Sequence, residues 1–99
     1  MIANFGDDAT EDLFHGNESA RVRRFPADLR PRAVRKLDLL NGAADVNDLR
    51  APPSNHLEKL SGSLAGFWSI RVNDQRRIVF RWNDGSALDV RLTDYHQRR

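Results

Sequence analysis

The chain has 99 residues, a formal net charge of +2, 39% hydrophobic residues and 30% charged residues. This length and composition predict one small globular domain over residues 1–99 rather than a disordered chain. There is no cysteine, which excludes a disulfide framework, a thiolate metal site and a cysteine nucleophile. Without an apolar run long enough to cross a bilayer, or a basic and apolar leader, we expect a cytoplasmic protein with no membrane partner.

Charge is distributed unevenly along the chain. Residues 1–20 carry five acids and no lysine or arginine, whereas residues 21–36 carry seven bases and a single acid, Asp28. Lysine accounts for two of the 16 bases, Lys36 and Lys59. The arginine side chain is a planar fork that binds phosphate in a bidentate manner, so the bias favours a nucleic-acid ligand. A genome rich in G and C gives the same bias, and at this point both explanations stand.

The N-terminal quarter predicts a strand, a helix and a loop. Residues 1–5 are apolar enough for an opening strand. The acids that begin residues 7–15 favour a helix N-terminus, and Gly16 favours the end of that helix. Residues 17–26 are polar and basic, which predicts a loop.

Residues 28–43 predict the main helix. Pro31 suits a first helical turn, and Gly42 lies near the end. Apolar residues recur at spacings of four, four and three, the spacing of one buried helix face: Leu29, Ala33, Leu37 and Leu40.

Residues 45–60 predict the connection from this helix to a sheet. Residues 45–49 favour a short helical turn, and two adjacent prolines make residues 50–55 a stiff connector. Residues 57–60 predict a short strand, which a Ser-Gly-Ser loop follows.

Three further strands are predicted over residues 67–72, 76–82 and 87–92. The connectors at residues 73–75 and 83–85 are short and rich in Asn, Asp and Gly, as is typical between antiparallel neighbours. The predicted fold class is α+β, with a mostly antiparallel sheet packed against two N-terminal helices.

Alternation along these strands predicts a sheet with two different faces. One face is apolar and carries Trp68, Ile70, Val72, Ile78, Phe80, Trp82, Leu88, Val90 and Leu92. The other carries Ser69, Arg71, Asn73, Arg77, Val79, Arg81, Asp89 and Arg91. Like charges on adjacent strands cost stability unless an anion or acid compensates them, and Asp74 and Asp89 are expected to do so in part. An arginine-rich face suits a polyanion, although outward arginines are more often solvated surface.

The residue pattern argues against several kinds of site. His15, His56 and His96 lack the close spacing of metal ligands, and no glycine-rich phosphate loop or serine-nucleophile motif is present. We therefore expect neither a metal nor a cofactor. Tyr95 and His96 are expected at the sheet edge, where histidine can transfer a proton and tyrosine can stack on a base. From the residues alone, they form either a functional pair or a solvated tail.

Segments spread over essentially the whole chain resemble the HigB-type toxins of the RelE superfamily, also called plasmid-maintenance killer proteins. The ordered set is specific, although each segment alone is weak. The segments are Ala9–Phe14 (ATEDLF), Arg35–Leu40 (RKLDLL), Asp48–Pro53 (DLRAPP), Leu57–Leu60 (LEKL), Ser69–Gln75 (SIRVNDQ), Arg77-Ile78 and Asp94–His96 (DYH).

This resemblance implies a compact RelE-like domain and the toxin of a type II toxin–antitoxin system. Such a toxin is expected to enter the ribosomal A site, cleave the bound mRNA without a metal and inhibit translation. A HigA-type helix-turn-helix antitoxin is expected to hold it inactive, with DNA reached only through the antitoxin complex. Residues 17–26 and 28–43 are candidates for contact with that antitoxin.

The resemblance also implies roles for individual residues. Arg77 matches the arginine expected to bind the scissile phosphate. Asp94, Tyr95 and His96 match the terminal trio, in which His96 is the preferred general acid or base, Tyr95 orients a base and Asp94 fixes local geometry. RNA-binding residues are expected at Arg71, Lys59, Arg76, Arg81 and Asn73.

Two departures from the family pattern leave alternatives open. Many members carry lysine at the position of Ser61 and an aromatic residue at the position of Arg76. Lys59 precedes Ser61 by two residues, so on a regular strand it faces the same way and partly replaces the missing ammonium. The alternatives are a non-catalytic RelE-fold module that docks an antitoxin or nucleic acid without cleavage, and an interaction domain whose arginines dock an acidic helix.

Overall fold

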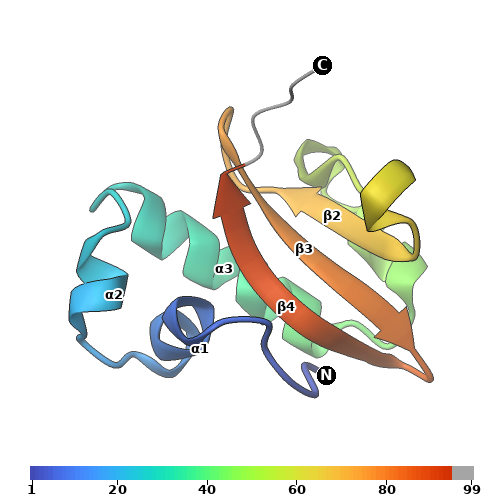
Figure 1. Ribbon diagram of the computed structural model, residues 1–99. Helices are drawn as coiled ribbons and strands as arrows, with labels where there is room; N and C mark the ends of the chain where they lie inside the picture. The colour runs from blue at the N-terminus through green and yellow to red at the C-terminus, as the bar shows by residue number, and fades with distance from the viewer. Residues whose placement is uncertain (95–99) are drawn as a thin grey trace.

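The computed structural model describes residues 1–94. In this range the helices are α1 (Asp8–His15), α2 (Ala20–Arg23) and α3 (Leu29–Gly42). The strands are β1 (Glu58–Lys59), β2 (Phe67–Arg71), β3 (Arg76–Asn83) and β4 (Ser86–Asp94), and short 3-10 turns lie at Val46–Arg50, Pro53–Asn55 and Gly62–Leu64. All strands are antiparallel, in the order β1-β2-β3-β4, and Figure 1 shows α3 running behind the sheet with α1 beside β4.

The two main helices form where the sequence predicts them. Asp7 caps α1, since its Oδ1 accepts a hydrogen bond of 2.8 Å from the Thr10 N–H. Gly16 ends α1 with a left-handed φ of 75°, a conformation that glycine adopts without steric cost. In α3 the predicted face is buried and consists of Leu29, Ala33, Leu37 and Leu40.

The core lies between these helices and the apolar face of the sheet. Its buried sheet residues include Ile70, Ile78, Phe80, Val90 and Leu92, which cluster with the buried face of α3. This confirms the predicted α+β architecture. The opposite face of β2 and β3 carries Ser69 and Arg77.

Residues 17–26 are not simply a loop, because they contain the short helix α2. Ser19 caps α2 by accepting a hydrogen bond of 3.2 Å from the Val22 N–H. Asp12 of α1 accepts hydrogen bonds from both Ser19 and Arg21, at 2.9 Å each. The bond from Ser19 is the main cause that holds the pKa of Asp12 below its usual value, and Arg21 acts in the same direction.

The prediction of an opening strand over residues 1–5 is wrong, although the segment does run beside β4. It forms two isolated parallel bridges, Ile2 with Ala87 and Phe5 with Val90. Regular pairing fails because β4 has a bulge between these bridges, where the Asp89 N–H donates to the Asn4 side-chain oxygen at 2.6 Å. The segment nevertheless covers the outer edge of β4, which would otherwise be open to other chains.

The same bulge changes which face Leu88 occupies. Val79 pairs with Arg91, but Arg81 pairs with Leu88, so the register shifts by one residue between them. Asp89 takes a φ of 53° at this point. Leu88 therefore shares the face of Arg81 rather than that of Val90, which corrects the prediction from alternation; the apolar face is continued instead by Ala87, which is fully buried.

Thr10 connects α1 to the edge of β4. Its side chain is fully buried, and its Oγ1 accepts a hydrogen bond of 2.9 Å from the Leu92 N–H. Thr10→Val keeps the shape but leaves that buried N–H without a partner, so we expect the free energy of unfolding to fall by about 1–3 kcal/mol in urea titrations. Thr93→Val, at a half-buried position on the opposite face of β4, is the matched control and is expected to change it by less than about 0.5 kcal/mol. Equal stability of the two variants would contradict a stabilising role for this bond.

Candidate active site

Arg77 is a largely buried arginine on the face of the sheet that points away from the helices. Its side chain has a relative exposure of 10%, and two neutral groups hold its guanidinium. Nε donates to the Ser69 hydroxyl at 2.7 Å, and Nη2 donates to the His56 carbonyl at 2.6 Å. Arg77 is therefore not a solvated surface arginine. Its guanidinium is buried and held in a fixed orientation.

The local fold explains why Arg77 is held in this way. In the β2–β3 hairpin, Arg71 is the cross-strand partner of Arg77. Ser69 precedes Arg71 by two residues, so its side chain lies on the same face as Arg77. The connector before β1 then supplies His56, whose left-handed φ of 44° directs the chain into β1. Glu58 in β1 pairs with Ser69, and its carboxylate lies 3.7 Å from the Arg77 guanidinium.

Ser69, His56 and Glu58 are neighbours of Arg77 that the sequence did not assign to the site. Ser69 was placed on the correct face by alternation, but its buried hydroxyl and its bond to Arg77 follow from the tertiary structure. The Leu-Glu pair at residues 57–58 was part of the family resemblance and was the available signal for Glu58. The His56 contact is made by a backbone carbonyl and leaves no mark in the sequence.

Arg71, Asn73 and Asp74 belong to the tight turn between β2 and β3. Arg71 donates to the Asn73 carbonyl at 3.2 Å and forms an ion pair with Asp74. The Asn73 side chain accepts bonds from the backbone N–H groups of Gln75 and Arg76, at 2.9 and 2.8 Å. The expected compensation of Arg71 by Asp74 is confirmed, and Asn73 has a structural role in the turn.

The end of β4 lies beside the start of β3. Thr93 is the cross-strand partner of Arg77, and Asp94 is the partner of Arg76. The predicted trio thus begins on the strand adjacent to Arg77. Tyr95 and His96 lie outside the described residues, so their catalytic roles stay predictions.

Arg81 shares the face of Arg77 but lies further along β3. It is 53% exposed, lies 3.4 Å from the Asp89 carboxylate and stacks over Phe67 at 5.4 Å from the ring centre. Asp89 therefore compensates Arg81, as expected. Arg81 is a surface cation two side-chain positions from Arg77 along the same face.

Lys59 does not join this group. It pairs with Trp68 in the sheet, and its ammonium lies 5.5 Å from the centre of the Trp68 ring. It therefore lies on the opposite face from Ser69, Arg77 and Glu58. Ser61 is exposed and precedes the turn at Gly62–Leu64, so no regular strand connects it to Lys59.

The arrangement suits recognition of a phosphate. Arg77 supplies a permanent charge that two neutral acceptors orient and Glu58 partly compensates. Arg71, which is paired with Asp74, supplies a second cation across the strand pair. Within residues 1–94, no three His, Asp or Glu side chains come together as metal ligands would.

The fold also occurs in a solved toxin–antitoxin complex. The chain is similar to a chain of the crystallised heterotetrameric YoeB–YefM toxin–antitoxin complex from Staphylococcus aureus, with a TM-score of 0.60, 15% identity and coverage of 98% of this chain and 99% of that one. Another structure of the YoeB–YefM complex from that organism gives a TM-score of 0.56 at 15% identity, again covering 98% and 99% of the two chains. This chain therefore shares its fold with those chains.

Sequence comparisons identify the family. The model of the HigB-like toxins, described as RelE-like toxins of the type II toxin–antitoxin system HigB, matches residues 3–96. Toxin HigB-1 of Vibrio cholerae is 40% identical over 93% of this chain and 95% of that protein. Endoribonuclease HigB of Proteus vulgaris is 29% identical over 97% of this chain and all of that protein. The chain belongs to the HigB-like family of RelE-like toxins of type II toxin–antitoxin systems.

None of the helices found in residues 1–94 has the length and apolar character that crossing a membrane requires.

Proposed function

We propose that this toxin is a metal-independent, ribosome-dependent endoribonuclease that cleaves mRNA in the A site and inhibits translation in the cytoplasm. The observation that carries the proposal is Arg77, whose guanidinium is held on the sheet face away from the helices, one strand from Thr93 and the start of the Asp94–His96 trio. The endoribonuclease name of the Proteus vulgaris relative supports it.

In the proposed reaction, the RNA supplies its own nucleophile. The 2′-oxygen attacks the adjacent phosphorus, and the bond between phosphorus and the 5′-oxygen breaks. The 2′-hydroxyl gives its proton to a base and the 5′-oxygen takes up a proton, leaving a 2′,3′-cyclic phosphate and a 5′-hydroxyl. Arg77 stabilises the negative charge on the phosphoryl oxygens. His96 is the proposed proton carrier, with Tyr95 orienting a base and Asp94 fixing the local geometry.

Other cations are proposed to hold the RNA backbone. Arg71 and Arg81 share the face of Arg77 and are proposed to bind phosphates on either side of the cleaved bond. Asn73 and Arg76 are proposed to contact RNA at the turn. Lys59, over Trp68 on the opposite face, has the weakest support among these residues.

A toxin of a type II system has an antitoxin as its partner. We propose a HigA-type helix-turn-helix antitoxin for this chain, with DNA contacted through the antitoxin rather than by the toxin. Residues 17–26 and 28–43 remain the proposed contact region, since both carry charge outside the surroundings of Arg77.

A non-catalytic binding module is the competing function. Ser61 and Arg76 favour it, because they depart from the family pattern. The acids beside the arginines favour it as well, since Asp74 and Asp89 neutralise part of the charge that a nuclease would direct at phosphate.

Mapping mRNA 5′ ends after induced expression distinguishes these functions. We expect new ends within translated codons, and intact transcripts when the same reporter mRNA lacks its start codon. A toxin that arrests growth without producing new 5′ ends would contradict the nuclease. New ends that also appear in the untranslated reporter would contradict dependence on the ribosome.

A further inference from the structure

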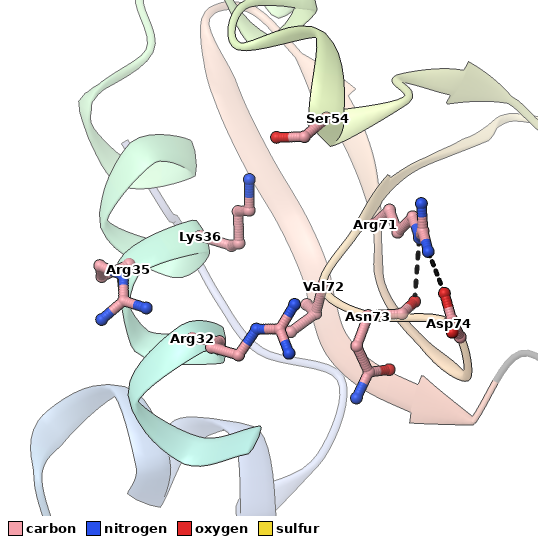
Figure 2. A pocket seen from close by; sticks show the side chains of 8 residues that line it. All are labelled: Arg32, Arg35, Lys36, Ser54, Arg71, Val72, Asn73 and Asp74. Atoms are coloured by element: carbon pink, nitrogen blue, oxygen red, sulfur yellow. Dashed lines mark hydrogen bonds and ion pairs between the residues drawn. The ribbon is translucent and has the colours of Figure 1, made fainter. Parts of the chain in front are cut away.

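A basic pocket of about 400 Å³ lies between α3 and the β2–β3 hairpin, away from the immediate surroundings of Arg77. It opens where β1 stops: β1 pairs with Trp68 and Ser69, so the Arg71 end of β2 has no strand beside it within residues 1–94. Figure 2 shows the side chains that line it, which are those of Arg32, Arg35, Lys36, Ser54, Arg71, Val72, Asn73 and Asp74.

The Lys36 ammonium is held in position by a buried amide. Its Nζ donates to the Asn55 side-chain oxygen at 2.5 Å. Asn55 is fully buried, and its amide nitrogen donates to the carbonyls of Leu49 and Ala51 at 3.0 and 3.2 Å. These two bonds fix which way the amide points, so its oxygen faces Lys36. The cation is therefore built into the pocket rather than left as a mobile surface charge.

The cations of α3 lack acidic partners in this part of the molecule. None of the ion pairs formed among residues 1–94 includes Arg32, Arg35 or Lys36. Burial, followed by repulsion from Arg32 and Arg35, lowers the pKa of Lys36 below its usual value. An anion in the pocket would relieve this repulsion, and the cluster costs stability while the pocket holds none.

Arg71 connects this pocket with the proposed active site. It is the cross-strand partner of Arg77, which places their Cα atoms about 5 Å apart, and it also lines the pocket. Figure 2 shows Arg32 reaching from α3 toward Val72 and Asn73, while Arg71 points to the other side of the hairpin. Arg71 thus lies between Arg77 and the α3 cations, at the end of β2 that β1 leaves unpaired.

We propose that this pocket binds a backbone phosphate of single-stranded RNA, a few nucleotides from the phosphate held at Arg77. The inference rests on the proposed function for its ligand. Arginine and lysine together favour phosphate over carboxylate here, because the RNA backbone repeats its charge along the path from Arg77 to Arg32. A single carboxylate of an acidic peptide could bind in the pocket, but it would not also contact Arg77.

Binding of a short, labelled 2′-O-methyl oligoribonucleotide tests the pocket apart from cleavage, because this RNA lacks the attacking 2′-hydroxyl. The variant is Arg32→Gln with Lys36→Gln, in which glutamine still offers a donor to the Asn55 oxygen. By fluorescence anisotropy over a range of KCl concentrations, we expect its affinity to fall about 10- to 100-fold. The slope of log affinity against log salt is expected to shrink by about 0.7 for the lost phosphate.

Arg24→Gln is the matched control, since it removes one exposed arginine at the end of α2. Its affinity is expected to stay within about twofold of the parental value. Arg32 forms no side-chain hydrogen bond or ion pair within residues 1–94, so Arg32→Gln alone continues the test if the double variant fails to fold.

The outcomes separate this inference from the proposed nuclease. Unchanged affinity and salt slope in the double variant, beside a parental protein that binds the RNA, overturn the pocket alone. Hexaglutamate serves as a carboxylate probe in the same assay. A double variant that loses affinity for hexaglutamate but keeps its affinity for RNA also overturns the phosphate site, in favour of a carboxylate site. If the double variant binds RNA more weakly, while the parental protein does not cleave ribosome-bound mRNA, the pocket is upheld and the nuclease is contradicted. A parental protein that binds no free RNA overturns the pocket, whereas the mapping of mRNA 5′ ends decides the ribosome-dependent nuclease separately.

Discussion

Arg77→Ala is expected to slow cleavage of ribosome-bound mRNA by about 10²- to 10³-fold in single turnover, the usual effect of removing one oriented donor from developing negative charge. The effect should be large because Arg77 is preorganised: Ser69 and His56 already hold its guanidinium before RNA binds. Burial strengthens the field of its charge by removing water, and the Glu58 carboxylate, 3.7 Å away, offsets part of that charge. Growth arrest on expression should disappear with cleavage.

Arg77 is buried, so its replacement also tests the fold. Arg77→Lys keeps the charge but lacks the fork that reaches Ser69 and His56 together, and it is expected to restore part of the lost rate. Arg24→Ala should cleave at the parental rate. Thermal unfolding of each variant separates lost chemistry from lost structure. An Arg77→Ala protein that folds and cleaves as fast as the parent would remove Arg77 from the site.

His96→Ala is expected to reduce the single-turnover rate by about 10²- to 10⁴-fold, the range for a positioned general acid or base. This prediction rests on the match of Asp94–His96 to the terminal trio of the family, and on the pairing of Asp94 with the first residue of β3. The dependence of the cleavage rate on pH is expected to change as well, because a general acid or base acts in one protonation state only.

His15→Ala is the control for this experiment. His15 packs edge-on against the rings of Phe5 and Phe14, at centroid distances of 5.9 and 5.4 Å, so its role is in packing. Its replacement should alter stability and leave both the rate and the pH profile in place. Parental cleavage by His96→Ala would mean that another group carries the proton.

The sequence predicted the parts of the fold that depend on long periodic patterns. The apolar spacing from Leu29 to Leu40 identified α3, and alternation identified β2 and β3 with the correct faces. Helix α2 was missed because one short turn gives no periodic signal, and Ser19 was read as part of a polar loop. Leu88 was placed on the wrong face because a single bulged residue reverses alternation without changing composition.

The candidate site was also predicted only in part. Alternation placed Arg71 and Arg77 on the same face of adjacent strands, and the structure pairs them directly. They did not predict the burial of Arg77, because one of its partners, the His56 carbonyl, comes from a connector 21 residues earlier in the chain, which only the folded structure brings close. The pocket at Lys36 was missed for the same reason, since it requires α3 and the hairpin to lie together.

The covering of the β4 edge also constrains the order in which the protein folds. Asn4 and Thr10 find their hydrogen-bond partners at Asp89 and Leu92, separations of 85 and 82 residues along the chain. Contacts of such high sequence separation form late, because the long loop between them must close first. During synthesis the N-terminal segment emerges first, but its partners on β4 are made last. The sheet therefore cannot be completed until β4 has left the ribosome, so the nascent chain lacks the covered edge of β4 while residues 89–92 are still being made.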